Sequence, residues 1–285
     1  MFILYIIHQI NESGLTMLSI NGLPAFNDNY IWMLADSESH TCYVVDPGDA
    51  SVVNTACQKA GYTLAGILIT HHHADHTGGI QQLASFAARE NHNIAASQPL
   101  PVYGPASENI KGITHPLSEG DLLTIAGETL TVIETPGHTS GHISYFGNWA
   151  NHPVLFCGDT LFAGGCGRLF EGTPKQMLNS LEKLAALPPE TLVYCAHEYT
   201  HSNLKFAQIV EPENSLLNQR IAEVNTLRYQ DQPTVPSSLK DELNTNPFLR
   251  ATCDSVQQAA CLHSGRPITS AEDTFMIIRQ WKDNF

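Results

Sequence analysis

One short stretch of the sequence limits what this chain can fold into. Residues 71–76 read His-His-His-Ala-Asp-His, which places four histidines and one carboxylate in a single loop. The preceding residues 64–70 are mostly apolar and predict a buried strand, while residues 80–89 have the character of a helix. Open α/β sheets place their functional sites at the carboxyl ends of strands. We therefore expect a sheet that presents this histidine loop at its edge.

The spacing within the loop predicts where its side chains point. In an extended segment, residues two apart share a face, so His71 and His73 are expected to point together and His72 elsewhere. Asp75 and His76 fall on the turn into the helix. A catalytic zinc ion typically takes three protein ligands plus water, so five candidates in one loop indicate two metal ions. Imidazole and carboxylate suit zinc, iron or manganese, and the alternative is a histidine tract that binds metal only adventitiously.

Three later segments repeat the same arrangement of a strand, a small residue and a ligand. An alternating strand at residues 130–134 precedes His138, an apolar strand at 154–158 leads to Asp159, and a third at 191–195 leads to His197. Taken alone, His138 is as well explained by a buried core histidine, and Asp159 by a helix cap. Beside the first cluster, we predict that both residues are metal ligands.

This ligand order resembles that of the metallo-β-lactamase superfamily. Within it, the chain is similar to the glyoxalase II (hydroxyacylglutathione hydrolase) family at residues 29–30, 45–48, 164–172, 197–200, 203–207 and 246–248, and the resemblance extends over residues 17–285. The resemblance implies an α+β fold, an αββα sandwich followed by a small all-helical domain. We expect a catalytic domain at residues 17–198 and a helical substrate-binding domain at 199–285. Residues 1–16 are expected to be a non-core N-terminal extension, with translation starting at Met17.

The family pattern also implies a role for each ligand. It assigns three ligands to one metal ion, three to the other and one to a bridge. These are His71, His73 and His138, then Asp75, His76 and His197, with Asp159 as the bridge. Asp75 would in addition orient the metal-bound hydroxide that attacks the substrate. We predict two divalent ions per chain, zinc first, with iron or manganese as alternatives.

The implied activity is hydrolysis of a glutathione thioester. The substrate would be S-(2-hydroxyacyl)glutathione, with S-D-lactoylglutathione as the first choice, in the second step of methylglyoxal detoxification. Arg168, Arg279 and Lys282 resemble the cations that hold the glutathione carboxylates, and Tyr199 resembles a tyrosine that hydrogen-bonds its peptide portion. Phe170 departs from the tyrosine of some relatives, and its hydroxyl contact would be lost. The two C-terminal cations could instead only offset the dipole of a terminal helix.

The charge and cysteine content of the chain argue against several classes of partner. The chain has 14 Lys and Arg against 28 Asp and Glu, a net charge of −14, which argues against a nucleic-acid surface. Its 7 cysteines are odd in number and form no CxxC pair, which favours a reducing cytoplasm over a disulfide framework. The apolar residues 1–7 are far shorter than the roughly 18 residues of a membrane helix. We expect a cytoplasmic monomer that acts on a small molecule, with no nucleic-acid or membrane partner.

The rest of the chain predicts strands first and helices later. Residues 31–35 and 41–45 predict a hairpin, 50–59 a helix closed by Gly61, and 122–133 a hairpin turning at Gly127. After His197 we predict helices at residues 203–209, 215–227, 237–243 and 271–285, a loop at 232–236, and no further strand.

Two rival functions remain open. One is a mononuclear iron persulfide dioxygenase of the same superfamily. The other is a non-catalytic metal-binding protein on this fold.

Overall fold

The computed structural model describes residues 18–90 and 99–285, so the predicted extension at residues 1–16 lies outside the described part. The chain forms two compact units that do not follow a single cut in the sequence. The N-terminal unit holds the described residues up to Glu134 together with Gly141–Gly158. The C-terminal unit holds Thr135–Ser140 and Asp159–Phe285.

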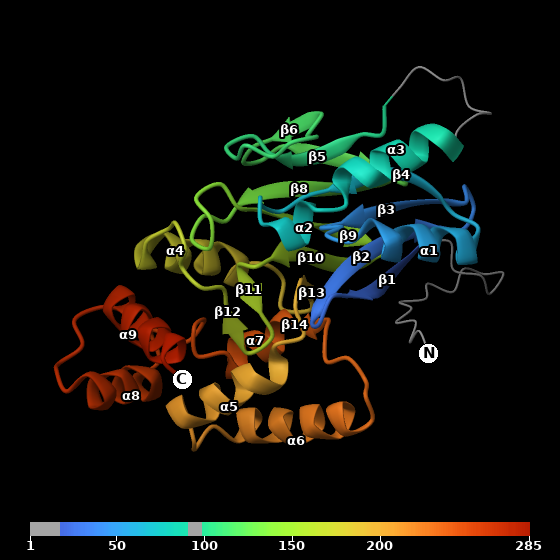
Figure 1. Ribbon diagram of the computed structural model, residues 1–285. Coiled ribbons are helices and arrows are strands. Elements are labelled where there is room, and N and C mark those ends of the chain that lie inside the picture. Colours follow the sequence, from blue (N-terminus) through green and yellow to red (C-terminus); the bar gives the residue numbers. More distant parts are fainter. Residues whose placement is uncertain (1–17, 91–98) are drawn as a thin grey trace. The chain divides into compact units, whose positions relative to one another are not determined.

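The first sheet of the N-terminal unit has six strands in sequence order (Figure 1). The first three strands are antiparallel neighbours, and the last three continue the sheet in parallel. They are β1 (Leu18–Ala25), β2 (Asn29–Asp36), β3 (Thr41–Val45), β4 (Thr63–Leu68), β5 (Val102–Pro105) and β6 (His115–Leu117). The predicted hairpin and the strand before the histidine loop are confirmed.

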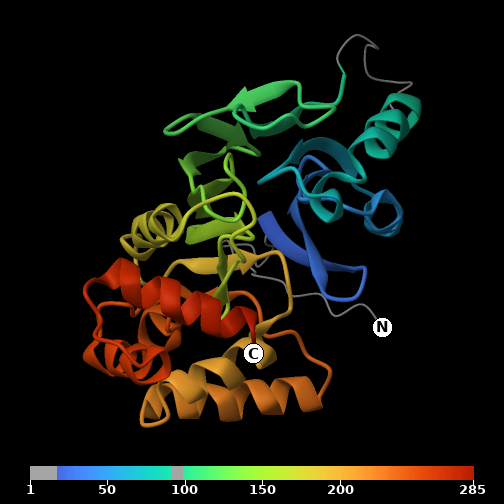
Figure 2. The same ribbon diagram turned by 60° about the vertical axis from the view of Figure 1, so that its left-hand side comes forward.

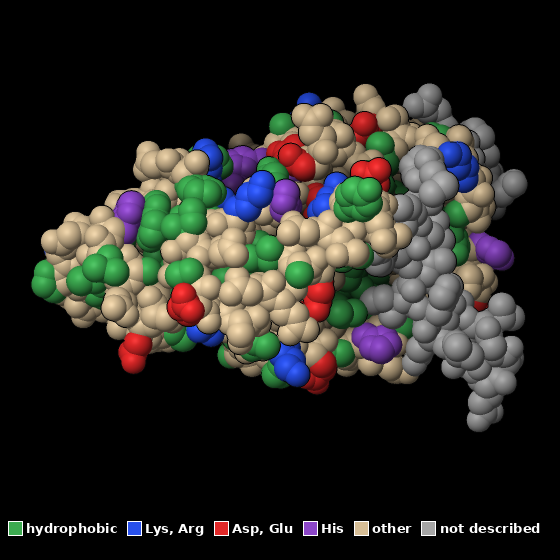
Figure 3. Space-filling model, turned by 90° about the horizontal axis from the view of Figure 1, so that it is seen from below, with side chains coloured by type: hydrophobic (Ala, Val, Ile, Leu, Met, Phe, Trp, Pro, Cys, Tyr) green, Lys and Arg blue, Asp and Glu red, His purple; other side chains and the backbone are tan. Residues whose placement is uncertain are grey.

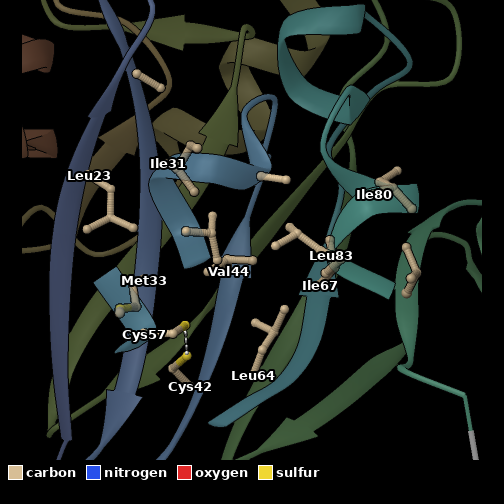
Figure 4. Packing of buried hydrophobic residues seen from close by; sticks show 14 of the residues in the cluster. Leu23, Ile31, Met33, Cys42, Val44, Cys57, Leu64, Ile67, Ile80 and Leu83 are labelled. Carbon is tan, nitrogen blue, oxygen red and sulfur yellow. Dashed lines mark hydrogen bonds between the residues drawn. The ribbon is translucent and has the colours of Figure 1, made fainter. Parts of the chain in front are cut away.

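Three helices belong to this sheet: α1 (Ala50–Ala60), α2 (Ala74–Thr77) and α3 (Ile80–Glu90). Helix α1 begins where the Asp49 side chain accepts the Ser51 N–H, and it ends at Gly61 with φ of 71°, as predicted. Apolar residues of α1 and α3 pack on one face of the sheet in a single core. Figure 4 shows Leu23, Ile31 and Val44 from the strands directed into this core. The thiols of Cys42 and Cys57 meet there at 3.5 Å.

The second sheet of this unit is an antiparallel meander of β7 (Leu122–Ile125), β8 (Glu128–Glu134), β9 (Ile143–Trp149) and β10 (His152–Gly158). The β7–β8 turn has φ of 48° at Ala126 and 80° at Gly127, which matches the two-residue hairpin turn that strand twist favours. The Tyr145 hydroxyl donates to the Ile69 carbonyl at 2.8 Å, and Trp149 Nε1 donates to the Ser19 carbonyl at 3.2 Å. The two sheets therefore pack face to face.

The C-terminal unit is mainly helical. Its strands form two short pairs, β11 (Leu161–Phe162) with β12 (Gly165–Cys166), and β13 (Leu192–Cys195) with β14 (Ser237–Ser238). Its helices are α4 (Pro174–Ala185), α5 (Thr200–Val210), α6 (Ser215–Tyr229), α7 (Leu239–Thr245), α8 (Asp254–Ser264) and α9 (Ala271–Asp283). Figure 2 shows α5 beside α6 and α8 beside α9.

Two expectations for this region are wrong. Strand β14 follows His197, where no strand was predicted, because two serines carry no periodic signal and pair with β13 only through tertiary contacts. The helix predicted from residue 237 begins instead at Leu239, since Ser238 is its N-cap.

Helix α8 was not predicted from the sequence. Its buried residues include only Val256 and Ala260, so the apolar stripe is too weak to recognise.

Candidate metal centre

The histidine loop follows β4 and runs into α2. His71 Nε2 lies 3.1 Å from His73 Nδ1, while the His72 ring turns away and its Nδ1 lies 3.0 Å from Glu108 Oε2. The predicted alternation of these side chains is confirmed. His71 is fully buried and His76 is 1% exposed, so their ring nitrogens are screened from bulk water.

Asp46 at the end of β3 organises these histidines, although it was not predicted as a site residue. Its Oδ1 accepts the Thr70 N–H at 2.8 Å, and its Oδ2 accepts the Thr70 hydroxyl at 2.7 Å. Since that hydroxyl donates to Asp46, it accepts from His71 Nδ1 at 3.0 Å, which leaves His71 Nε2 unprotonated in the neutral ring. His76 Nδ1 also lies 3.0 Å from Asp46 Oδ2. A carboxylate behind a metal-binding histidine fixes the tautomer of the ring in this way, as Asp46 does for His71 through Thr70.

Asp75 is held ionised beside the histidines. Its Oδ2 lies 3.4 Å from His76 Nε2 and accepts the Asn29 amide at 3.0 Å. The hydrogen bond with His76, the charge of that ring and the Asn29 amide hold the pKa of the Asp75 carboxyl well below its usual range. Asp75 is therefore an anion at neutral pH, as a metal ligand must be.

Two glycines let the backbone close around this loop. A Cβ on Gly48 would stand 1.9 Å from the Asp75 carbonyl oxygen, and one on Gly79 would stand 2.3 Å from the Pro47 carbonyl oxygen. Any side chain at either position would displace the backbone that carries the predicted ligands.

The C-terminal unit gathers the other three predicted ligands. Asp159 Oδ2 lies 3.4 Å from His138 Nε2, and Asp159 Oδ1 lies 3.3 Å from His197 Nε2. His138 Nδ1 donates to the Arg168 carbonyl at 2.8 Å, so its Nε2 carries the lone pair on the side of Asp159. His197 stacks on Tyr199 with ring centroids 4.7 Å apart. Asp159 therefore lies between two imidazoles, with one ring nitrogen near each of its oxygens.

The donor sets fit divalent metal ions. In the N-terminal unit, Asp46, His71 and His76 bring their potential ligand atoms within 4.8 Å of one another. In the C-terminal unit, a carboxylate has an imidazole nitrogen near each of its oxygens. These are nitrogen and oxygen donors, which zinc, iron and manganese all accept. Each unit thus offers a partly prepared set of ligands.

A cavity of about 530 Å³ in the C-terminal unit brings the predicted substrate residues together. Arg168, Tyr199, Arg279 and Lys282 all line it, together with the predicted ligands His138 and Asp159. The cavity therefore combines cationic groups with a histidine and a carboxylate that could bind metal. Phe170 also lines it, and its ring packs edge-on against His138 at 5.2 Å.

The three cationic side chains of this cavity differ in how firmly the surrounding residues hold them. Arg279 is 5% exposed, donates to the Cys166 carbonyl at 2.9 Å, and lies over the Phe248 ring at 4.9 Å. The Arg168 side chain is 66% exposed. Lys282 is half-buried, and burial followed by repulsion from Arg279 and Arg168 lowers its pKa. Arg279 is fixed, whereas Arg168 can reorient.

Two models of known protein families match consecutive parts of this chain. A family model described as the metallo-beta-lactamase superfamily matches residues 28–197, and one described as the hydroxyacylglutathione hydrolase C-terminus matches residues 198–285. The fold and the ligand pattern thus define a metallo-β-lactamase superfamily protein. Proteins named hydroxyacylglutathione hydrolase from Hahella chejuensis and Cupriavidus taiwanensis are 51% and 50% identical, each matched over 94% of this chain and 100% of the relative. The chain belongs to the hydroxyacylglutathione hydrolase family.

Solved structures agree on the fold. ETHE1 from Myxococcus xanthus matches with a TM-score of 0.59 and 23% identity, over 92% of this chain and 90% of that one. A metallo-beta-lactamase from Staphylococcus aureus matches with a TM-score of 0.57 and 21% identity, over 88% and 67%. The predicted αββα sandwich with a helical C-terminal domain is confirmed. Among the described residues, no helix has the length and apolar character needed to cross a membrane.

Proposed function

We propose that this protein hydrolyses S-(2-hydroxyacyl)glutathione, with S-D-lactoylglutathione as the first substrate, to glutathione and a 2-hydroxy acid. This is the second step of methylglyoxal detoxification. The observation that carries the proposal is the cavity in which Arg168, Tyr199, Arg279 and Lys282 meet the ligands His138 and Asp159. The full-length relatives near 50% identity support it and do not favour the persulfide dioxygenase.

Two divalent metal ions, zinc first and iron or manganese as alternatives, would serve this reaction. Bound ions lower the pKa of water so that hydroxide is available at neutral pH, and they polarise the carbonyl under attack. We propose His71, His73 and His138 for one ion, Asp75, His76 and His197 for the other, and Asp159 between them. This assignment is supported by the family pattern and by the tautomers that Asp46 and the Arg168 carbonyl impose on His71 and His138.

The protein's own residues would position the substrate and the attacking water. Glutathione carries two carboxylates, and Arg168 and Lys282 offer them exposed or half-exposed cations in an otherwise acidic protein. Arg279 would add its positive charge from a buried position, and the Tyr199 hydroxyl would bond the peptide portion. Asp75, which is ionised, would orient the attacking water through a hydrogen bond.

A protein nucleophile is unnecessary in this reaction. The leaving thiolate belongs to a thiol with an ordinary pKa of about 8.5, so it departs without a strong acid. Cys166 lines the cavity, but burial raises its pKa to about 11, so the thiol stays protonated at neutral pH. We assign Cys166 to packing.

Further proposals concern the domain organisation, the cellular location and the partners of this protein. The junction of the two family models at residues 197 and 198 supports a catalytic domain at 17–198 and a helical substrate-binding domain at 199–285. The seven free cysteines are consistent with a reducing cytoplasm. On the face shown in Figure 3, basic and acidic side chains are interspersed, which offers no broad cationic area for nucleic acid. We propose a cytoplasmic monomer with a small-molecule substrate.

Metal analysis combined with turnover tests the proposal. Near two metal ions per chain, with loss of S-D-lactoylglutathione that Asp159→Ala abolishes, is the expected result. Glu223→Ala, on an exposed part of α6, is the matched control and should retain activity. One iron per chain with oxygen uptake on glutathione persulfide and no thioester loss would contradict the proposal. Metal binding without any turnover would point to the non-catalytic alternative.

A further inference from the structure

Asp283, near the end of α9, lies among the cations of the cavity. Its Oδ1 is 3.0 Å from Arg279 Nη2 and 3.8 Å from Arg168 Nε. Asp283 lines the cavity beside Lys282, and its side chain is 37% exposed. One protein carboxylate therefore contacts two of the three cations that are proposed to receive the substrate carboxylates.

The two contacts of Asp283 differ in kind. Arg279 is held by a second acceptor, the Cys166 carbonyl, and by the Phe248 ring, so its position does not depend on Asp283 alone. The Arg168 pair is long at 3.8 Å, and the Arg168 side chain is 66% exposed. Exposed pairs of this kind are weak. Arg168 can therefore exchange Asp283 for another carboxylate at little cost.

Asp283 also counteracts the crowding of positive charge. The pKa of Lys282 is lowered by burial and then by Arg279 and Arg168, and Asp283 opposes that shift. A carboxylate at this position makes the cavity less attractive to any anion that enters it.

We propose that Asp283 limits the affinity of this cavity for anionic ligands: it pairs with Arg168 and Arg279 in the free protein and competes with the carboxylates of the entering substrate for Arg168. The identity of that substrate rests on the proposed function. Substrate and released glutathione carry the same carboxylates, so affinity gained from the cations alone binds both equally and does not accelerate the reaction. Asp283 keeps this shared affinity low and so favours release of the product.

The variant Asp283→Asn tests the inference, because asparagine keeps an oxygen that can accept from Arg279 but removes the charge. We expect KM for S-D-lactoylglutathione, and the dissociation constant of the unreactive probe S-methylglutathione, to fall about three- to tenfold, as removal of one partly screened charge implies. The gain should shrink at high salt. A neutral thioester without carboxylates should show no change in KM.

Glu272→Gln is the matched control. Glu272 is exposed in the first turn of the same helix, so the substitution changes net charge equally without touching the cavity. It should leave KM for both thioesters and the probe affinity within twofold of the wild-type values.

Several outcomes would overturn the role of Asp283. One is an unchanged or raised KM for S-D-lactoylglutathione in Asp283→Asn. Another is an equal fall in KM for the neutral thioester, which would reveal a structural effect of the substitution. If the wild-type protein binds S-methylglutathione but hydrolyses no glutathione thioester, the proposed function fails, and the affinity ratio between the two proteins still decides the role of Asp283. If the wild-type protein does not bind the probe, the inference fails as well.

Discussion

Removing the charge of Asp46 should weaken metal binding without unfolding the protein. Asp46 touches no substrate, but its carboxylate accepts the Thr70 hydroxyl at 2.7 Å and lies 3.0 Å from His76 Nδ1. In Asp46→Asn, one oxygen can still accept the Thr70 N–H. The amide that replaces the second oxygen cannot accept the Thr70 hydroxyl, and the substitution removes the negative charge 3.0 Å from His76 Nδ1.

The expected loss of metal affinity in Asp46→Asn follows from these contacts. The substitution releases the tautomer of the predicted ligand His71, which is set through Thr70, and removes the charge beside the predicted ligand His76. Loss of such an outer partner typically lowers metal affinity 10- to 100-fold, which corresponds to about 1.4–2.7 kcal/mol. We expect zinc affinity to fall within this range and thioester turnover to fall at limiting zinc, with recovery when zinc is in excess.

The assay is a competition titration of metal-free protein with zinc and a chromogenic chelator, with circular dichroism to verify the fold. Asp36→Asn is the matched control. It removes the same charge from the same unit, in an exposed turn where Asp36 accepts the Glu38 N–H at 2.9 Å. An affinity within twofold of wild type for Asp46→Asn, or an equal loss in Asp36→Asn, would refute the reasoning.

Three further predictions concern stability, metal content and thiol reactivity. Glu242→Gln should lower the free energy of unfolding in urea by about 3 kcal/mol or more, because Glu242 is fully buried and paired with Arg220 at 2.5 Å. Gly48→Ala should deplete bound metal, measured as ions per chain, because the new Cβ would meet the Asp75 carbonyl. Cys166 should resist iodoacetamide until the pH approaches about 11, because burial raises its pKa. The raised pKa also affects the stability of the fold, because the folded protein favours the neutral thiol of Cys166. This contribution to the free energy of unfolding is complete below the ordinary thiol pKa and is lost as the pH rises through about 11.

Each of these predictions has a control. Glu223→Gln, exposed on α6, should change stability by no more than about 0.5 kcal/mol. Gly61→Ala meets no atom within 4 Å and should keep its metal, although its φ of 71° is unfavourable for alanine. The partly exposed Cys253 and Cys261 should be alkylated first at pH 8. Contrary results would be a mild effect of Glu242→Gln, full metal content in Gly48→Ala, or early labelling of Cys166.

Local patterns in the sequence were sufficient for much of the fold. The alternation that separates His72 from His71 and His73 is a property of any extended segment, so it could be predicted without the structure. The same holds for helix α1, whose end is set by Gly61, and for the hairpin turn at Gly127. In each case the residues that determine the conformation are close neighbours in the chain.

Contacts between distant residues that no local pattern or family resemblance marks could not be predicted. Asp46 acts on Thr70, 24 positions later, and only the fold brings the two together. Asp283 meets Arg168 across more than a hundred residues, and nothing near Asp283 in the sequence signals that contact. Asp46 directly follows the strand at residues 41–45 and lies in the segment 45–48 that carries the family resemblance, so its position was an available signal of its role.

The course of the chain through its two compact units limits how the helical part could be transplanted into another protein. The family models divide the sequence at residue 197, whereas the C-terminal unit begins at Asp159 and also includes the separate segment Thr135–Ser140, which carries His138. A gene fragment that encodes only residues 199–285 would therefore omit α4, β11 and β12. The boundary between the family models and the boundary between the compact units therefore differ. A transplant cut at residue 198 would carry the helices without α4 and β12, against which α9 and α5 pack.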